Sequence, residues 1–442
     1  MRTPVSSLAA LLAGASLVQA QQTIHVNGAC GDNAWSGASP VCAAPDGPKQ
    51  TIKAAIAAAV NDDSVLVADG VYSGTGNTGI SFGGKRIVLR SANGPDACVI
   101  DALGVARAFT MADNLTPDTL IDGFTIRNGG STGSGGAFWF HHQNNPTIRN
   151  CIITANAASQ GGAVHTETNA DPTFINCTFT GNTAVRGGAF SITGASRPKI
   201  INCVIAGNAA TDQAGALYIQ MFNAPGPQII NCTIAGNTAA NTGGAMAVLA
   251  GSVALRNSVV WNNTAPAGAQ LAVGSTGGSP GTISVAHSIV QGGRAGVLIQ
   301  GVGVLTWLLG NSTMDPTFAA PGAGNFRLAP GSPAIDASDN LALPPGIVTD
   351  RDGKPRFVDD PATPDTGLPG GAGGEYIADM GAYEFQGCYP DCNADGNLTV
   401  ADFGCFQTAY VLAHAYADCN QSGTLTVADF GCFQGAYVLA CP

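Results

Sequence analysis

The sequence of 442 residues is poor in charge, and its few charges are mostly negative. Only 11% of the residues are Asp, Glu, Lys or Arg, and the net charge is −11. Affinity for nucleic acid comes largely from basic side chains, so this balance argues against nucleic acid as a partner. Few charges together with 60 glycines favour a turn-rich β protein over a helical one.

Long apolar runs are also missing beyond the first twenty residues. Residues 295–310 come nearest, but polar residues and glycines interrupt them before they reach the roughly 18–20 apolar residues that span a bilayer. Residues 1–20 read as a secretory signal, with Arg2 at the positive start, an apolar stretch from Val5 to Val18, and a cleavage site ending at Ala20. We therefore expect a secreted or cell-surface protein without a transmembrane segment after cleavage.

The middle of the chain repeats one short pattern about every twenty-six residues. An asparagine precedes cysteine, or in one repeat serine, at Asn150-Cys151, Asn176-Cys177, Asn202-Cys203, Asn231-Cys232 and Asn257-Ser258. A second asparagine follows five residues after each of these, at Asn156, Asn182, Asn208, Asn237 and Asn263. A Gly-Gly-Ala pattern, such as Gly187-Gly188-Ala189, recurs between them. Self-similarity at a fixed period predicts a solenoid of stacked rungs.

Aligning the repeats predicts the inner wall of this solenoid. One column contains Cys98, Phe124, Cys151, Cys177, Cys203, Cys232, Ser258 and Ser288, and an apolar residue lies two positions after each of them. An alternation of two puts both positions on one face of a strand. The asparagines are expected at the turns, in left-handed conformation and bonded to their counterparts in adjacent rungs. We predict a buried stack of free thiols, because parallel side chains give poor disulfide torsions. A thiol metal site is the alternative.

The ends of the solenoid have their own patterns. Residues 23–26 alternate as a short strand, and Cys30 and Cys42 flank a loop and are suited to a local disulfide. The apolar spacing in residues 50–60 predicts a helix that caps the open end. Residues 359–374, rich in Pro, Gly and Asp, are expected to form an irregular excursion before a final rung.

The strand after each Gly-Gly-Ala pattern provides the candidate surface of the solenoid. Alternation predicts two outward columns: Trp139, His165, Ser191, Tyr218 and Ala247 form one, and His141, Glu167, Thr193, Gln220 and Leu249 the other. Trp139 and Tyr218 are the candidate sugar-binding aromatics. His165 or His141 with Glu167 is the weaker candidate for acid–base catalysis, because glycosidases use a pair of carboxylates. Arg186, Arg197 and Lys199 are interpreted as solvated loop charges.

Residues 388–442 contain a tandem duplication that predicts two calcium loops. Oxygen-bearing side chains at loop positions 1, 3 and 5, glycine at 6 and a carboxylate at 12 are what calcium requires. The predicted ligands, counting position 7 as a backbone carbonyl, are Asp391, Asn393, Asp395, Asn397 and Asp402, then Asp418, Asn420, Ser422, Thr424 and Asp429. Two Asp/Asn turns that only cap helices are the alternative. Cys388 and Cys441 are suited to clasp this region, and the pairing of its other four cysteines stays open.

Two parts of the sequence resemble known families. The pattern from Phe179 to Asn182, followed by Gly187 to Phe190, resembles the FxxN and GGA repeats of polymorphic outer-membrane proteins, which are pectin-lyase-like right-handed parallel β-helices. The later motifs, such as residues 331–336 and 379–384, are similar to secreted bacterial β-helix proteins of the choice-of-anchor type. The duplicated tail resembles a type I dockerin, which binds cohesin domains. Its loop positions 10 and 11, Val-Ala in both repeats, differ from the hydroxyl residues common in dockerins.

Together these patterns predict an all-β chain with three parts. Residues 1–20 form the signal peptide, residues 21–386 a right-handed parallel β-helix with an N-terminal helical cap, and residues 387–442 a small α-helical, dockerin-like or EF-hand-like calcium module. The predicted function is binding or processing of extracellular polysaccharide, with a lyase or glycoside hydrolase as the enzyme classes considered. The tail would dock onto a cohesin-like or other surface receptor. The alternative is a non-catalytic adhesin or a structural protein.

Overall fold

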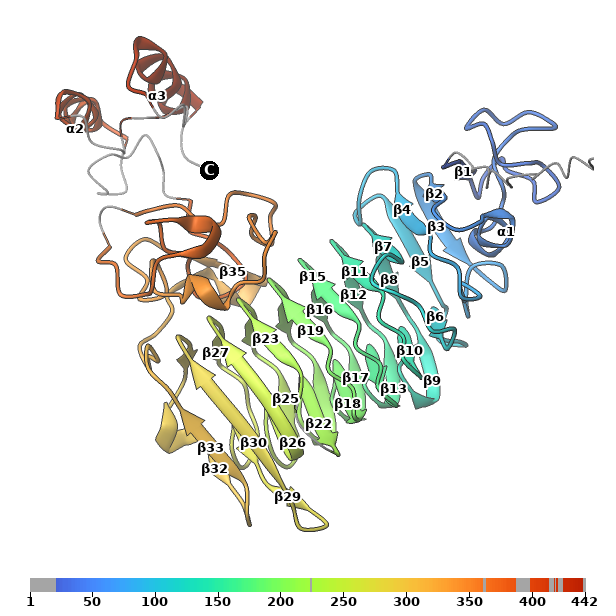
Figure 1. The fold of residues 1–442 in the computed structure, drawn as a ribbon, viewed down its shortest axis with the longest axis horizontal. Helices are drawn as coiled ribbons and strands as arrows, with labels where there is room; N and C mark the ends of the chain where they lie inside the picture. Colours follow the sequence, from blue (N-terminus) through green and yellow to red (C-terminus); the bar gives the residue numbers. More distant parts are fainter. Residues whose placement is uncertain are drawn as a thin grey trace, which may run out of the picture.

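The computed structural model describes residues 21–222, 225–360, 363–386, 398–412, 417, 419 and 424–439. Its central part is a solenoid of stacked parallel strands, drawn from blue to yellow in Figure 1. Each complete rung has four sides, which we number face 1 to face 4 in chain order. The first twenty residues, predicted as a signal peptide, lie outside the described residues.

Faces 1 and 2 run along the whole solenoid. Face 1 contains β1 (Thr23–Val26), β2 (Ser64–Val67), β4 (Val88–Ser91), β7 (Leu120–Asp122), β11 (Thr147–Arg149), β15 (Thr173–Ile175), β19 (Lys199–Ile201), β23 (Gln228–Ile230), the second half of β26 (Met246–Arg256), β30 (Ser279–Ala286) and β33 (Val304–Trp307). Face 2 contains β3 (Gly70–Ser73), β5 (Cys98–Asp101), β8 (Thr125–Arg127), β12 (Ile152–Thr154), β16 (Thr178–Thr180), β20 (Val204–Ala206), β24 (Thr233–Ala235), β27 (Val259–Trp261) and β31 (Ile289–Val290).

Faces 3 and 4 complete the rungs. Face 3 is short and contains β9 (Gly130–Ser134), β13 (Ala157–Gln160), β17 (Thr183–Arg186), β21 (Ala209–Gln213) and β25 (Thr238–Ala239). Face 4 contains β6 (Phe109–Met111), β10 (Phe138–Phe140), β14 (Val164–Thr166), β18 (Phe190–Gly194), β22 (Leu217–Met221), the first half of β26, β28 (Leu271–Val273) and β32 (Leu298–Ile299). Two hairpins follow later in the chain, β29 (Ser275–Thr276) with β30 and β34 (Phe318–Ala320) with β35 (Asn325–Leu328).

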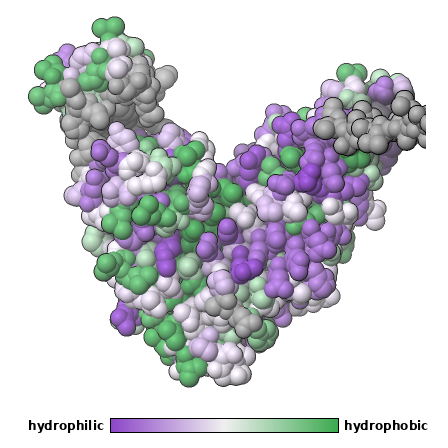
Figure 2. All heavy atoms as spheres, viewed as in Figure 1, coloured by the Kyte–Doolittle hydropathy of each residue, from purple (hydrophilic) through white to green (hydrophobic). Residues whose placement is uncertain are grey.

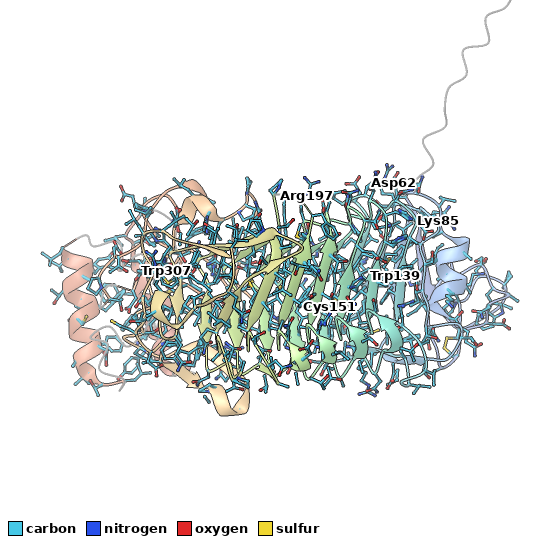
Figure 3. The ribbon with its side chains drawn as sticks, turned by 90° about the horizontal axis from the view of Figure 1, so that it is seen from below. Asp62, Lys85, Trp139, Cys151, Arg197 and Trp307 are labelled. Atoms are coloured by element: carbon cyan, nitrogen blue, oxygen red, sulfur yellow. A yellow bond between two sulfur atoms is a disulfide. The ribbon has the colours of Figure 1, made fainter. Side chains whose placement is uncertain are left out.

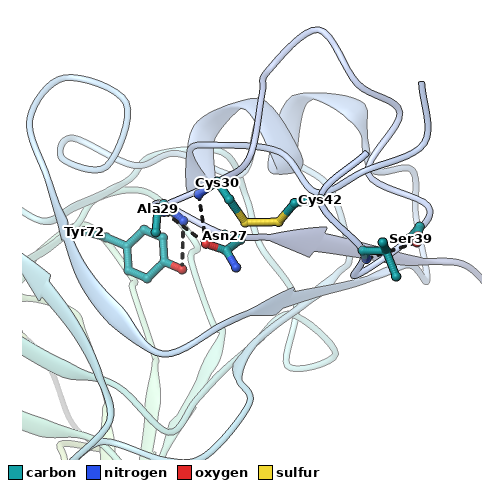
Figure 4. The surroundings of a disulfide bond; sticks show 8 residues. Asn27, Ala29, Cys30, Ser39, Cys42 and Tyr72 are labelled. Carbon is teal, nitrogen blue, oxygen red and sulfur yellow. Dashed lines mark hydrogen bonds between the residues drawn. A yellow bond between two sulfur atoms is a disulfide. The ribbon is translucent and has the colours of Figure 1, made fainter. Parts of the chain in front are cut away.

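The described helices are few and short. They are α1 (Ile52–Ala58), α2 (Val400–Val411) and α3 (Val427–Leu439), with 3₁₀ turns η1 (Arg294–Gly296), η2 (Pro321–Ala323), η3 (Asn340–Ala342) and η4 (Gly371–Gly373). None of the described helices is both long and apolar enough to cross a membrane. The predicted N-terminal helical cap is confirmed: α1 lies against β1 and β2, and its buried Ile52, Ala55 and Ile56 join the main core. The predicted Cys30–Cys42 disulfide is also present, in the loop beside Asn27 and Tyr72 (Figure 4).

The predicted inner wall is confirmed in register. Ile153 is paired with Ile126 on one side and with Phe179 on the other, and the whole column is fully buried. The five thiols of the column, at Cys98, Cys151, Cys177, Cys203 and Cys232, are free and buried. In Figure 3, Cys151 lies within the outline of the ribbon, whereas Arg197 lies at its periphery. Burial raises the pKa of the Cys177 thiol well above its ordinary value, as expected for a packing residue rather than a metal ligand.

Two roles are predicted for the asparagines, a left-handed turn and bonding between rungs, and each series has one of them. Asn150, Asn176, Asn202, Asn231 and Asn257 have positive φ and make the corner between faces 1 and 2. In the second series, the residue before each asparagine takes the left-handed conformation instead, for example Gly181 before Asn182. The asparagine then turns inward, and Asn182 Nδ2 donates to Asn208 Oδ1 at 2.9 Å. Repetition makes this a buried amide ladder from Asn156 to Asn263.

The chain after residue 328 does not continue the rungs. Residues 329–386, here called the exit cap, contain isolated bridges but no strand among those described, so the expected final rung is wrong. The cap instead packs on the outer side of face 2, where Ala382 and Tyr383 contact Val204 and Ala235. The excursion within residues 359–374 is irregular, as predicted, in its described part.

Candidate functional site

The predicted outward columns lie on face 4 in the expected register. Trp139 is paired with His165, His165 with Ser191, Ser191 with Tyr218, and Tyr218 with Ala247. In the second column Thr193 is paired with Gln220. The register then shifts, so Ala250 rather than the predicted Leu249 lies opposite Gln220.

The outward side chains of the first column are nevertheless buried. His165 is 3% exposed, Ser191 0% and Tyr218 2%. The cause is a re-entrant bend between faces 3 and 4, which we call the inner corner. Gly187 makes this bend with φ of 67°, and a Cβ atom there would collide with the Phe190 carbonyl oxygen. The last residues of β13 and β17, Gln160 and Arg186, therefore reach over the column.

Two such residues line the inner corner. The guanidinium of Arg186 lies 5.7 Å from the Tyr218 ring centre and pairs with Asp212 at 2.9 Å. Ser191 Oγ lies 3.4 Å from Gln160 Oε1 and donates to it. The interpretation of Arg186 as a solvated loop charge is therefore incomplete, because its side chain is 43% exposed but its guanidinium also lies over the Tyr218 ring of this column. The sequence contains a signal that identifies these inner-corner residues: Arg186 and Gln160 both directly precede a Gly-Gly pair.

Glu167 is the centre of the most polar part of the inner corner. Its Oε1 accepts a 2.8 Å hydrogen bond from Trp139 Nε1. His141 Nε2 lies 4.0 Å from Oε1, and His165 Nε2 lies 3.8 Å from Oε2. The structure thus brings all three candidate acid–base residues together with Trp139. About a third of the Glu167 side chain, 33%, is exposed, so this carboxylate is accessible to a ligand.

The charge state of His165 follows from its burial. Burial is the main cause that lowers the pKa of His165 to about 4, and Arg107 and His141 lower it further against the opposing effect of Glu167. His165 is therefore a neutral imidazole at neutral pH. Its Nδ1 is buried and has no hydrogen-bond partner among the described residues. A buried imidazole with so low a pKa is a weak base, which favours a positioning role over proton abstraction.

The two candidate aromatic residues offer less free ring face than expected. The Arg107 guanidinium lies 5.0 Å from the Trp139 ring centre, and the His141 ring is stacked 5.1 Å away at 14°. Arg107 precedes its strand and His141 follows its own, so the two approach Trp139 from opposite ends of face 4. Tyr218 donates from its hydroxyl to Gln220 Oε1 at 2.8 Å and packs with Ala247. The single N–H of Trp139 is already donated to Glu167, so the exposed part of the Glu167 carboxylate is the group of this set that can hydrogen-bond a ligand.

A hollow of about 300 Å³ adjoins this cluster. It lies just after strands β6, β10 and β14, and two pairs of its lining residues directly follow His141 and Glu167 in the chain. The lining residues are Ala112, Asn114, His142, Gln143, Thr168 and Asn169. All of these except Ala112 have positive φ. The volume is at the lower end of the roughly 300–1,000 Å³ of small-ligand pockets, and the lining offers amides and a hydroxyl.

The hydropathy of the visible surface changes along the solenoid (Figure 2). Hydrophilic residues dominate over its N-terminal rungs, and hydrophobic ones are more frequent toward its C-terminal rungs. Face 4 changes in the same direction, because Ala247, Ala272, Leu249 and Leu298 form an apolar cluster beyond Tyr218. The polar groups of the inner corner are therefore concentrated near Glu167.

The predicted calcium loops lie mostly outside the described residues. Asp391, Asn393, Asp395, Asn397, Asp418, Asn420 and Ser422 are among the residues not described, whereas Asp402, Thr424 and Asp429 are described. Asp402 and Asp429 are buried and accept 2.7 Å hydrogen bonds from the backbone of Thr399 and Thr426. Each carboxylate thus stands in the first turn of its helix, in agreement with both the loop and the capping interpretations. Cys419 and Cys432 form a disulfide within the second repeat.

Residues 116–313 match the family described as the right handed beta helix region. The predicted right-handed parallel β-helix is thereby confirmed, and this match includes Trp139, Glu167 and four of the six residues that line the hollow. No curated protein matches the sequence. Two solved structures resemble this β-helix, each at 13% identity. The crystal structure of pectate lyase Pel9A has a TM-score of 0.43, covering 83% of this chain and 97% of that one. A rhamnogalacturonan lyase has a TM-score of 0.35, with 61% and 74% covered.

Proposed function

We propose that this β-helix binds an extracellular polysaccharide at its inner corner, with Glu167 and the adjoining hollow as the point of recognition. One observation carries this proposal: an accessible carboxylate, fixed by the Trp139 indole at 2.8 Å, stands beside a polar hollow of about 300 Å³. Sugars present dense hydroxyl groups, and a carboxylate accepts hydrogen bonds from them about twice as strongly as a neutral oxygen does.

Binding is favoured over catalysis by the composition of the cluster. The described contacts of Glu167 bring one carboxylate, an indole and two imidazoles together. Glycoside hydrolysis ordinarily uses two carboxyl groups about 5–9.5 Å apart. His165, with a pKa of about 4, is poorly matched to a base that works near neutral pH. Lyase or hydrolase activity is therefore an outcome to be tested, not part of the proposal.

Export and attachment complete the proposal. The signal-like residues 1–20 would direct secretion, and the duplicated tail would attach the protein to a cohesin-like or other receptor, with calcium in its loops. Exposed apolar residues support a docking role for the tail. Val400 and Val411 on α2 are 86% and 81% exposed, and their repeat equivalents Val427 and Val438 on α3 are 86% and 78% exposed. Contiguous exposed apolar surface marks interaction sites, so we propose these repeated exposed valines as part of the docking surface.

The test is a binding screen with a charge-matched control. The full chain and its Glu167→Gln variant would be titrated with uronic-acid polymers and neutral glycans, and release of unsaturated or reducing ends would be followed. Glu375→Gln is the control, because Glu375 is an exposed carboxylate in the exit cap. We expect Glu167→Gln to weaken glycan binding by roughly tenfold and the control to leave it unchanged.

Two outcomes would contradict the proposal in different ways. Equal glycan binding by the Glu167→Gln variant and the unmodified chain would exclude the inner corner as the site. Absence of binding to every glycan class would favour the alternative of an adhesin for another partner or a structural protein. Product release that disappears in Glu167→Gln would instead identify an enzyme and assign the carboxylate a catalytic role.

A further inference from the structure

The exit cap holds a group of carboxylates unrelated to the inner corner and to the tail. Asp336, Asp359 and Asp365 each direct one oxygen to a common point, and these atoms lie within 4.8 Å of one another. Asp336 is fully buried, whereas Asp359 and Asp365 are exposed. Three like charges this close repel one another, so the arrangement is costly without a counterion.

Asp336 is fixed in place by its backbone. Its N–H donates to Asp379 Oδ1 at 2.8 Å, and its carbonyl oxygen accepts from Thr366 and Gly367, both at 3.0 Å. Asp336 also has φ of 50°, a left-handed conformation that non-glycine residues adopt uncommonly. The carboxylate is therefore held beside the segment of the cap that carries Asp359 and Asp365.

One oxygen of this buried carboxylate lacks a partner. Asp336 Oδ2 accepts from the Asp360 N–H at 3.1 Å, whereas Oδ1 is buried with no hydrogen-bond partner among the described residues. Most buried side-chain oxygens in proteins are satisfied, so an unsatisfied one requires an explanation.

We infer that Asp336, Asp359 and Asp365 bind a divalent cation, and that this cation is calcium. Calcium takes six to eight oxygen ligands at about 2.3–2.6 Å, so oxygens on opposite sides of one ion stand about 5 Å apart. The 4.8 Å limit of the group fits this span. All three ligands are carboxylates, without nitrogen or sulfur, which favours a hard cation over zinc. The exposed side leaves room for water ligands, which such sites use.

The cation would tie one segment of the exit cap to the part of the cap that contacts the β-helix. Asp336 bonds to Asp379, and the Asp379 carbonyl accepts from Asn231 Nδ2 at 2.8 Å on the corner of the solenoid. Asp359 and Asp365 lie on the irregular segment that leads away from this contact. A cation shared by the three carboxylates would tie that segment to the docked part of the cap. Calcium removal should therefore loosen the cap before it affects the rungs.

The test separates this site from the calcium loops predicted in the tail. The full chain carrying Asp402→Asn and Asp429→Asn, which removes the carboxylate at position 12 of both loops, would be freed of metal and titrated with calcium by calorimetry. We expect one remaining site with a Kd of about 10⁻⁴ to 10⁻³ M, the range of extracellular calcium modules. Addition of Asp359→Asn and Asp365→Asn should abolish this heat.

A matched pair of substitutions controls for net charge. Asp315→Asn with Glu375→Gln removes two exposed acidic groups from the same C-terminal region without touching the group, and should leave calcium binding intact. Calcium should also raise the Tm of the tail-substituted chain and slow proteolysis within residues 329–386, and both effects should vanish in the Asp359→Asn/Asp365→Asn background. No binding at millimolar calcium would overturn the inference, as would binding that survives these two substitutions.

Discussion

The rungs and the exit cap both bury many polar groups, but they satisfy them in opposite ways. In the rungs, each buried asparagine bonds to its equivalent in the next rung, as when Asn208 Nδ2 donates to Asn237 Oδ1 at 2.9 Å. These buried side chains are neutral amides, and the same hydrogen-bond arrangement is repeated from rung to rung. In the cap, most of the buried polar side chains are ionisable, such as Arg356, Asp379 and Glu384, and their contacts are not repeated along the chain. Repetition thus allows polar burial without buried charge, whereas a cap that terminates the repeat must satisfy each group individually.

Arg356 is the centre of the charged network in the cap. It is fully buried, and its Nη2 donates to the carbonyl oxygens of Asp379 at 3.1 Å and Gly381 at 2.6 Å. Its Nε lies 3.7 Å from Glu384 Oε2. Burial and Asp379 raise the pKa of Glu384 well above its ordinary value, although Arg356 opposes this shift. The network is therefore sensitive to the loss of its one buried cation among the described residues.

The largest effect is expected from Arg356→Met. This substitution removes the buried positive charge beside Glu384 and leaves the Gly381 carbonyl oxygen without its donor. Breaking a buried pair from one side costs about 3–5 kcal/mol. Urea denaturation would measure the loss, and limited proteolysis should locate it in residues 329–386. Arg294→Met, at an exposed position, is the control. A loss below about 1 kcal/mol would show that the network does not hold the cap.

Asn208→Ala tests the neutral amide ladder of the rungs. Asn208 Nδ2 also donates to the Phe179 carbonyl at 3.0 Å, and its Oδ1 accepts from the Asn182 N–H at 3.0 Å. Leaving these buried groups unsatisfied should cost about 3 kcal/mol. Because each rung contacts its neighbours, hydrogen exchange should increase mainly in β16, β20 and β24.

Asn241→Ala provides the control for the ladder. Asn241 is exposed and donates to Asp212 Oδ1 at 2.8 Å, so its loss should cost well under about 1 kcal/mol. An equal loss of stability in the two variants, or an increase of exchange spread over all rungs, would contradict local satisfaction of the ladder.

Sequence periodicity was sufficient for the rungs because each rung repeats the chemical environment of the last. The column from Cys98 to Ser288 could be aligned by spacing alone, and every member lies where the alignment puts it. At the inner corner, the outward direction of His165 was predictable, but its burial was not, because this depends on how sharply Gly161 and its equivalents bend the chain. The shift that displaces Leu249 leaves no trace in the spacing.

The exit cap could not be predicted for a different reason. Its contacts join residues far apart in the chain, such as Asn231 and Asp379, which are 148 positions apart. No period relates such pairs, and motifs that look like the start of another rung are equally compatible with a cap. The same holds for the group of Asp336, Asp359 and Asp365, because the chain between the first two folds back in a way that local patterns do not specify.

His165→Asn should change how stability depends on pH. The fold lowers the pKa of His165 to about 4 from 6.5, mainly through burial, so the unfolded chain binds more protons between these values. Stability contributed by neutral His165 is therefore present above pH 6.5 and is lost as pH falls toward about 4. As the pH falls through this window, the difference in free energy of unfolding between the unmodified and the substituted chain should shrink by on the order of 2 kcal/mol.

The comparison for His165 is made with urea denaturation at several pH values. His25→Asn is the control, since His25 lies in β1, far from Glu167 in the sequence, and burial lowers its pKa less strongly. A constant difference between the unmodified and His165→Asn chains across the window would contradict a buried neutral imidazole at the inner corner.

The smallest effect is expected from Cys177→Ser. In the thiol column, Cys177 donates from Sγ to the Ile175 carbonyl, and its N–H donates to Cys203 Sγ at 3.4 Å. Ser258 occupies the same column with the same pattern, accepting from the Cys232 N–H at 3.1 Å and donating to the Arg256 carbonyl at 2.7 Å. A hydroxyl therefore satisfies this position, and Cys177→Ser should cost no more than about 1 kcal/mol in urea denaturation. Cys177→Leu, which overpacks the wall, should cost about 1–3 kcal/mol. If serine were as harmful as leucine, the column would depend on thiol chemistry; equivalence with cysteine would show that the rungs require only a small buried group that can accept one backbone N–H.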